Sequence, residues 1–312
     1  MASVDRLSTE LCGIRLRTPV IAASGTFGYG IEFEKILDLN ALGGLVTKGL
    51  SREPIDGNAP PRLWHTEGGM MNSVGLQNVG IKAFIREKLP KLRPYSVRVF
   101  ANVFGYAIED YVEVVRALED AEGIAGYELN VSCPNTKGGG IFFSSDPALL
   151  AELIGQVRSA ARRPLLVKLS PNVARIEPFA LAAEAAGADA ISLINTVVSF
   201  ALDPETRQPR IASRFAGLSG PAIKPLALRL VAEAAAAVKI PIVGIGGIAT
   251  GRDAAEFLIA GASAVQVGTA TFIDPRAPQL IARELAQFLE KAQLGSLREL
   301  AGSAARPCTI EQ

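Results

Sequence analysis

Apolar runs that end in polar or glycine residues recur eight times along the chain, and a segment with helical spacing follows most of them. The runs are continuous and not alternating, which is typical of parallel strands covered on both faces. They span residues 19–24, 43–49, 97–103, 126–132, 164–170, 189–196, 241–247 and 263–269. Strands that alternate with helices in this number predict a (β/α)8 TIM barrel, and an open doubly wound sheet is the alternative architecture.

Helix signals occupy the segments between these runs. Asp146 and Pro147 suit the N-cap and the first position of a helix, and Thr250 and Asp253 form a capping-box pattern before residues 254–260. Helical apolar spacing or composition predicts further helices over 31–39, 81–89, 108–118, 149–157, 176–186, 222–238 and 279–292.

Three segments fall outside the repeating unit. Residues 9–17 predict a short N-terminal hairpin, in which Cys12 is a small buried or half-buried filler. Long loops are predicted after the second strand, over 50–78, and after the sixth, over 197–219. Long loops at the carboxyl ends of barrel strands are usually functional. The chain shows no linker, so we expect one barrel domain over 1–312.

Composition excludes several classes of protein. The 312 residues are 49% hydrophobic, and 32 basic against 31 acidic residues give a net charge of +1, so neither a nucleic acid nor an anionic membrane is an expected partner. Cys12, Cys133 and Cys308 are sparse and odd in number, which fits a reducing compartment, and Cys308 is expected to be inert. The N-terminus lacks an apolar signal segment, and the apolar window 179–202 breaks at Gly187. We therefore expect a cytoplasmic protein without a membrane span.

Polar side chains cluster where the predicted strands end. Because barrel active sites lie at the carboxyl ends of the strands, these side chains should meet at one mouth. They are Ser24, Lys48, Asn102, Asn130, Lys168, Asn195 and Thr196, with Cys133 just past the fourth strand. Polar groups inside apolar runs are costly to bury unless something pairs with them, so their convergence predicts a ligand site.

The seventh and eighth strands end in glycine-rich turns. Backbone amides there form the usual phosphate site of a barrel, at Gly246, Gly247, Gly268 and Thr269. The string GIGGIATG superficially resembles a dinucleotide fingerprint, but Gln266 stands where an acid is required. We therefore predict flavin mononucleotide (FMN) across the mouth, with Lys168 stabilising the reduced ring. The alternative for Lys168 is a lysine that extends from a strand end into solvent.

The sequence offers no cluster of histidines for acid–base chemistry. His65 is the single histidine, which argues against a multi-histidine metal site, and it is expected to pack or cap within the long second loop. The remaining acid–base candidates at the mouth are Cys133, Lys48 and Lys168. A free thiol is only a few per cent ionised near neutral pH, so a cysteine base requires local activation.

Ten strings distributed from the first strand to the eighth match one family. They are ASGTFGYG (23–30), TKGLSREP (47–54), GNAPPR (57–62), MNSVGLQN (71–78), NVSCPN (130–135), VKLSPN (167–172), LINT (193–196), LSGPAIKP (218–225), GIGGI (244–248) and VGTA (267–270). The chain resembles the class 1 dihydroorotate dehydrogenases. The resemblance implies oxidation of dihydroorotate to orotate in pyrimidine synthesis, with a hydride passing from C6 to N5 of FMN while Cys133 removes the C5 proton. The membrane-bound class 2 uses serine as this base.

The resemblance also implies ligand contacts. For FMN these are Ser24, Lys48, Gly49, Asn102, Asn130, Lys168, Ile194, Gly220, Gly246, Gly247, Gly268 and Thr269. For orotate they are Lys48, Asn72, Ser73, Val74, Gly75, Leu76, Asn130, Asn195 and Thr196. Amides donate and accept hydrogen bonds, and lysine suits a carboxylate, so these residue types fit a flat diimide with one acidic group.

Within the family the context of Lys48 and Gly49 is most similar to class 1B. That class pairs the catalytic subunit with a second protein, which carries FAD and a 2Fe–2S cluster and passes electrons to NAD, and the assembly is a homodimeric core or a heterotetramer. The alternative is class 1A, a homodimer that uses fumarate. Outside the family, Lys168 could form the Schiff base of an aldolase, or the chain could bind a phosphorylated metabolite without catalysis. The glycines at 138–140 suggest a mobile lid beside Cys133.

Overall fold

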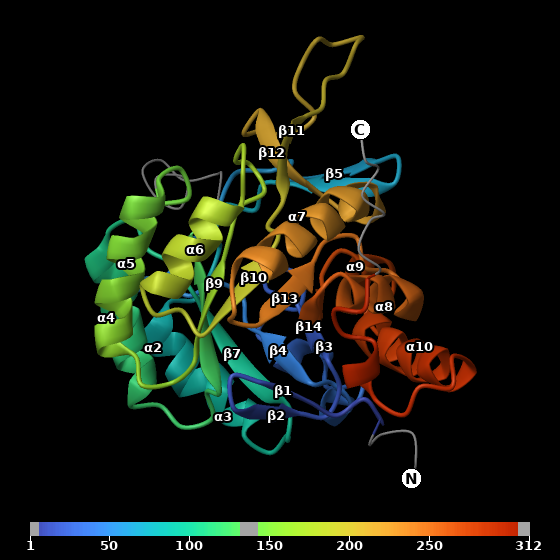
Figure 1. Ribbon diagram of the computed structural model, residues 1–312. Coiled ribbons are helices and arrows are strands. Elements are labelled where there is room, and N and C mark those ends of the chain that lie inside the picture. Colours follow the sequence, from blue (N-terminus) through green and yellow to red (C-terminus); the bar gives the residue numbers. More distant parts are fainter. Residues whose placement is uncertain (1–5, 132–142, 305–312) are drawn as a thin grey trace.

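Eight parallel strands close into a barrel at the centre of the molecule (Figure 1). The computed structural model describes residues 6–131 and 143–304. In hydrogen-bonded order the strands are β3 (Val20–Ala22), β4 (Gly44–Val46), β7 (Arg98–Val103), β8 (Gly126–Asn130), β9 (Leu165–Lys168), β10 (Ala190–Leu193), β13 (Ile242–Ile245) and β14 (Ala262–Val267), and β14 pairs again with β3. All eight predicted strands are confirmed, and closure of the sheet excludes the open alternative.

Burial on both faces explains the continuous apolar runs. Inside the barrel, side chains such as Ile21, Val46 and Phe100 form one small buried cluster. The larger cluster lies between the strands and the surrounding helices. A residue on either face of a strand is therefore in a core, and there is no exposed face to require polar alternation.

The predicted N-terminal hairpin closes the end of the barrel opposite the mouth. Strands β1 (Thr9–Leu11) and β2 (Ile14–Leu16) pair antiparallel, and Leu11 and Leu16 are buried in the interior cluster. Cys12 and Gly13 make the two-residue turn with φ of 51° and 76°, as hairpin turns of this type require. The half-buried thiol of Cys12 donates to the carbonyl of Asp189 at 3.2 Å. Burial, and then the Asp189 carboxylate, raise the pKa of this thiol to about 12. The predicted role of Cys12 as a small filler is confirmed.

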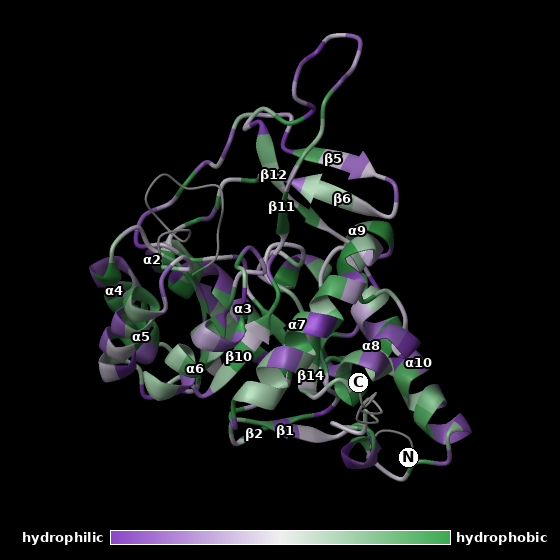
Figure 2. Ribbon diagram, turned by 45° about the horizontal axis from the view of Figure 1, so that its top comes forward, coloured by the Kyte–Doolittle hydropathy of each residue, from purple (hydrophilic) through white to green (hydrophobic). Residues whose placement is uncertain are grey.

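Helices surround the barrel and present apolar faces to it, so α5 and α10 combine green and purple stretches in Figure 2. They are α4 (Ile108–Glu119), α5 (Pro147–Ala160), α6 (Glu177–Ala185), α7 (Lys224–Ala237), α8 (Gly251–Ile259) and α10 (Ala277–Lys291), with the short α9 (Ala270–Ile273) after β14. Two predicted caps are confirmed. Asp146 accepts from the amide of Ala148 at 2.7 Å, and Thr250 and Asp253 form the reciprocal capping box. Among the described residues no helix is long and apolar enough to cross a bilayer.

The helix predicted over 31–39 is absent. Two short 3-10 turns, η1 (Ile31–Phe33) and η2 (Leu39–Ala41), stand there. The carboxylate of Asp38 accepts from the amide of Asn40 and so starts a new turn where a helix would continue. The segment predicted at 81–89 is helical but composite, as α2 (Ile81–Ala83), the π-helical η3 (Phe84–Lys88) and α3 (Leu89–Leu92). Pro90 removes an amide donor within it, which favours the irregular hydrogen bonding. Two more 3-10 turns are η4 (Pro221–Ile223) and η5 (Leu297–Glu299).

The two long connections are partly regular structure, contrary to the prediction of loops. The first contains β5 (Leu63–Thr66) and β6 (Gly69–Asn72), and the second contains β11 (Val197–Phe200) and β12 (Phe215–Ser219). Together they form an antiparallel sheet in the order β11–β12–β6–β5. This sheet lies over one end of the barrel at the top of Figure 1, and the loop between β11 and β12 extends beyond it. The mouth of the barrel therefore has a structured cover.

Candidate functional site

A cavity lies between the carboxyl ends of the barrel strands and the four-stranded sheet. The predicted strand-end side chains line it: Ser24, Lys48, Asn102, Asn130, Lys168, Asn195 and Thr196. Cys133 and the glycines at 138–140 lie outside the described residues. The barrel topology thus brings together polar groups that are up to 245 residues apart in the sequence, since Ser24 and Thr269 share the cavity.

The residues expected to hold FMN all line this cavity: Ser24, Lys48, Gly49, Asn102, Asn130, Lys168, Ile194, Gly220, Gly246, Gly247, Gly268 and Thr269. Those expected to hold orotate also line it, with one exception: Lys48, Asn72, Val74, Gly75, Leu76, Asn130, Asn195 and Thr196. The exception is Ser73, which is fully buried and accepts a hydrogen bond from Asn58 Nδ2 at 2.8 Å. Its hydroxyl therefore stabilises the segment that leads into Val74, on the side away from the cavity. The individual ligand contacts remain predictions.

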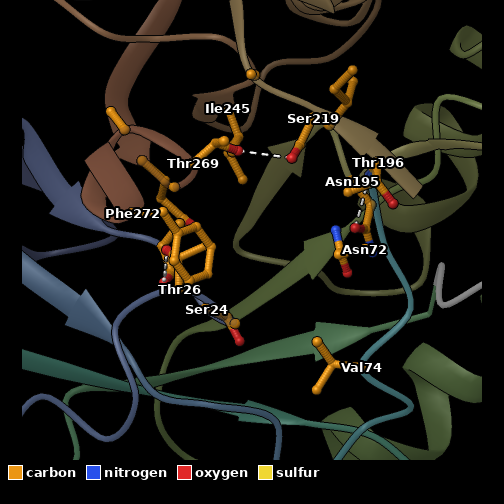
Figure 3. A pocket seen from close by; sticks show the side chains of 18 of the residues that line it. Ser24, Thr26, Asn72, Val74, Asn195, Thr196, Ser219, Ile245, Thr269 and Phe272 are labelled. Carbon is orange, nitrogen blue, oxygen red and sulfur yellow. Dashed lines mark hydrogen bonds between the residues drawn. The ribbon is translucent and has the colours of Figure 1, made fainter. Parts of the chain in front are cut away.

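Figure 3 shows two sides of the cavity. Asn72, Asn195 and Thr196 gather on one side, and Asn195 Nδ2 lies 3.4 Å from Asn130 Oδ1. Thr269 and Phe272 are on the other side, near the glycine-rich strand ends. One side therefore offers amide donors and acceptors, whereas the other offers backbone groups and an aromatic face.

The glycine-rich side can approach a ligand closely. Gly246 and Gly247 have φ of 133° and 75°, in the region that favours glycine. A Cβ on Gly246 would lie 2.7 Å from the Cβ of Ala227, and one on Gly247 would lie 2.9 Å from the carbonyl oxygen of Gly220. Within the described residues, the amides of Gly246, Gly247, Gly268 and Thr269 donate to no other protein group. Such unpaired amides suit a phosphate.

A buried carboxylate lies beneath the residues that line the floor of the cavity. Glu128 is fully buried, and its Oε1 accepts from Asn102 Nδ2 at 2.8 Å. Its Oε2 accepts from Ser192 Oγ at 2.9 Å and from Gln266 Nε2 at 2.6 Å. The Lys168 ammonium lies 3.8 Å from Oε1, which is an ion-pair distance and longer than a hydrogen bond. Every neighbour in this network is a donor, so both oxygens of the carboxylate accept hydrogen bonds.

Two acceptors at the floor have no donor. Asn102 Oδ1 and Gln266 Oε1 are buried and have no hydrogen-bond partner among the described residues. Both residues line the cavity. A buried acceptor without a donor is unfavourable, so the orientation of these two amides needs a cause elsewhere in the network.

Lys48 supplies a second cation at the rim. It is half-buried, and its backbone amide donates to the carbonyl of Gly28 at 2.7 Å. Burial lowers the pKa of its ammonium, and the nearby charge of Arg62 lowers it further. In the part of the chain that the structure describes, no carboxylate lies within ion-pair distance of Lys48. The site therefore has a partly desolvated cation that an anionic ligand can neutralise.

His65 lies on β5 with an exposed side chain and does not line the cavity, so nothing in the structure assigns it a chemical role. The sequence reasoning missed Glu128 and the acceptor of Gln266. Each is a polar residue inside an apolar strand, the same signal that identified Asn102 and Lys168. It also missed Ser219, because the strand that carries it has no clear pattern.

Comparisons with known proteins agree with this geometry. Residues 6–289 match the family model described as dihydroorotate dehydrogenase. A relative from Solibacter usitatus, named putative dihydroorotate dehydrogenase A (fumarate), is 65% identical over 96% of this chain and 98% of its own length. Relatives from Geotalea uraniireducens and Geotalea daltonii are each 52% identical, over 95% and 97% of this chain and 97% and 99% of their own lengths. Both are named dihydroorotate dehydrogenase B (NAD(+)), catalytic subunit.

Proposed function

Because the chain belongs to the dihydroorotate dehydrogenase family, we propose that it oxidises (S)-dihydroorotate to orotate with bound FMN, in pyrimidine synthesis in the cytoplasm. The observation that supports this most directly is the cavity, which combines unpaired glycine amides, two cations and a row of side-chain amides. A Schiff-base aldolase and a non-catalytic binder have no comparable support, since the family model covers most of the chain.

The proposed cofactor contacts divide by chemistry. The amides of Gly246, Gly247, Gly268 and Thr269 would hold the phosphate, since they line the cavity and donate to no other protein group among the described residues. At the floor, Asn102 and Lys168 would contact the ring, and the Lys168 ammonium would supply a donor. Bound FMN would supply a two-electron acceptor for the hydride from C6 of the substrate.

The proposed substrate contacts lie on the amide side. Lys48 would pair with the carboxylate of orotate, because it is a half-buried cation without a carboxylate partner among the described residues. Asn72, Asn130 and Asn195 would match the alternating donors and acceptors of the diimide ring. Several amides arranged around a flat ring would fix its orientation, which oxidation at one carbon–carbon bond requires.

Cys133 is the proposed base for the C5 proton. Strand β8 ends at Asn130 in the cavity wall, three residues before Cys133. The carbonyl of Asn130 accepts from the hydroxyl of Tyr111 on α4 at 3.0 Å, so the strand end from which this segment departs is firmly held. A thiolate would accept the proton while the hydride leaves, which avoids a carbanion.

We propose that electrons pass to NAD through a partner subunit, since several relatives are named as NAD(+)-type catalytic subunits. The resemblance to class 1B implies that this partner carries FAD and a 2Fe–2S cluster. The covering sheet and α9 leave large apolar side chains exposed at the cavity, namely Leu63, Phe272 and Ile273. Such a surface is available to a partner. Fumarate is the second candidate acceptor, since the relative of 65% identity carries that name.

Anaerobic titration separates these proposals. Purified protein should be yellow, and dihydroorotate should bleach its flavin absorbance with one equivalent of orotate formed. Fumarate or NAD is then added to the bleached protein, with and without a co-expressed partner. A colourless protein that takes up no FMN would overturn the proposed function, whereas return of colour with fumarate alone would favour the second acceptor.

A further inference from the structure

We propose that Glu128 is a positioning residue, which fixes the side chains at the floor of the cavity and sets the charge beneath the flavin ring. The inference rests on the proposed function, because it concerns the same cofactor. Glu128 makes no contact with the cavity itself and acts through three side chains that line it, those of Asn102, Lys168 and Gln266.

The first step concerns the direction of the two amides. A side-chain amide has a donor end and an acceptor end, and its plane can be turned over at little intrinsic cost. Against a carboxylate, only the donor end is acceptable at 2.8 Å or 2.6 Å, because the reversed amide would place two oxygen acceptors in contact. Glu128 therefore turns Asn102 Oδ1 and Gln266 Oε1 away from itself. Both oxygens remain buried without a donor among the described residues.

The second step concerns charge. Glu128 is fully buried and Lys168 is 7% exposed, so their charges are poorly screened. At 3.8 Å the ammonium is held by charge and keeps its hydrogens for other acceptors. A buried ion pair is weak evidence for stability, since an apolar replacement is often equally stable. The pair is better explained by what it does at the cavity, where it limits the positive potential that reaches the ring.

These two effects give different measurable results in Glu128→Gln, which is nearly isosteric. Loss of the carboxylate charge leaves Lys168 uncompensated, and a more positive site favours the reduced, more negative flavin. The two-electron potential of bound FMN should therefore rise, and a tenfold gain for the reduced form corresponds to about 30 mV. The new amide also places an N–H donor where the carboxylate had an acceptor, so Asn102 or Gln266 has to turn its oxygen toward residue 128. The floor is then rearranged, and oxidised FMN should bind about tenfold more weakly.

Glu119→Gln is a matched control, because Glu119 is also a buried carboxylate in a dense network but touches no residue of the cavity. It should lower thermal stability without moving the FMN potential. Glu128→Asp keeps the charge but shortens the reach, so it should restore most of the potential and not the affinity. If Glu128→Gln does not fold, Glu128→Asp still tests the proposal through its expected loss of FMN affinity.

The outcomes separate this inference from the proposed function. If wild-type protein binds FMN and is bleached by dihydroorotate, yet the folded Glu128 variant has the wild-type potential and FMN affinity, Glu128 has no positioning role. If Glu119→Gln moves the potential as much as Glu128→Gln, the effect reflects general loosening and the inference also fails. If wild-type protein takes up no FMN, the proposed function fails first. A raised potential confined to Glu128→Gln, with recovery in Glu128→Asp, supports the proposal.

Discussion

The hydroxyl of Thr269 donates to the hydroxyl of Ser219 at 2.8 Å, and this bond joins the end of barrel strand β14 to the end of β12 in the covering sheet (Figure 3). The adjacent β6 pairs with β12, with Asn72 opposite Gly217. The sheet that carries Asn72 is thus tied to the barrel rim that carries the glycine turns. Both sides of the cavity are parts of one hydrogen-bonded framework, which supports precise placement of a ligand between them.

Cys133→Ala should slow the bleaching of FMN by dihydroorotate at least about 100-fold while FMN stays bound, because no base remains for the C5 proton. Cys133→Ser should retain a slow reaction whose rate rises with pH, since a hydroxyl is a poorer acid than a thiol. Stopped-flow absorbance measures both. Cys12→Ala is the control, because Cys12 lies at the opposite end of the barrel. Bleaching of Cys133→Ala at the wild-type rate would assign the base to another group.

Orotate affinity should depend on the charge of Lys48. The pKa of this lysine is lowered from 10.5 by burial, so its proton is lost below that pH in the folded protein. Orotate should therefore bind less tightly as pH rises toward 10.5, because the carboxylate loses its cation. The contribution of Lys48 to folding has the opposite sign: between the lowered pKa and 10.5 the unfolded chain holds more protons, so stability rises with pH there.

Flavin absorbance changes on titration with orotate from pH 7 to pH 10 measure this affinity. Lys48→Met should weaken orotate binding about tenfold at pH 7 and remove most of the pH dependence. Lys82→Met, at an exposed lysine on α2, is the control and should behave like wild type. An unchanged alkaline loss of affinity in Lys48→Met would mean that a different group titrates.

Glu119 should stabilise the fold in a pH-dependent way. Burial alone would raise the pKa of its carboxyl. Hydrogen bonds from the backbone amides of Arg162 and Arg163, from the Arg162 guanidinium and from the Tyr127 hydroxyl outweigh burial and lower the pKa from 4.5 to about 2. A lowered carboxyl pKa gives stability that is present above 4.5 and is lost as pH falls through about 2.

Glu119→Gln should therefore lower the free energy of unfolding by about 2–3 kcal/mol at neutral pH, with a deficit that shrinks between pH 4.5 and pH 2. Urea denaturation across that range measures it. Glu87→Gln removes the exposed partner of Arg86 and should cause no measurable loss. A deficit that is constant with pH would show that packing, and not the charge, is responsible.

Gly246→Ala should destabilise the protein by about 1–3 kcal/mol, because it combines a φ of 133° with a new methyl group 2.7 Å from the Cβ of Ala227. Gly155→Ala makes the same chemical change within helix α5, where no atom lies within 4 Å. It should raise stability by about 0.5–1 kcal/mol. Thermal unfolding of the two variants compares them directly. Equal melting temperatures would show that the turn after β13 relaxes freely.

The barrel and much of the site could be predicted because their signals are local. Each barrel strand is a continuous apolar run, and each run ends in the polar or glycine residue that faces the mouth. The caps at Asp146 and Thr250 were predictable for the same reason, since capping involves residues only two or three positions apart. The helix predicted over 31–39 failed where a local competitor, the side chain of Asp38, favoured a new turn.

Tertiary structure decided the four-stranded covering sheet and the hydrogen bonds around Glu128. Strands β5 and β6 are short and weakly patterned. Strand β6 pairs with β12, almost 150 residues away, and β5 pairs with β6. Glu128 receives donors that are 26, 64 and 138 positions distant, from Asn102, Ser192 and Gln266. The sequence by itself determined which polar groups stand at the strand ends. Only closure of the barrel decided which way their amides turn, because hydrogen-bond direction depends on neighbours that the chain brings together through folding.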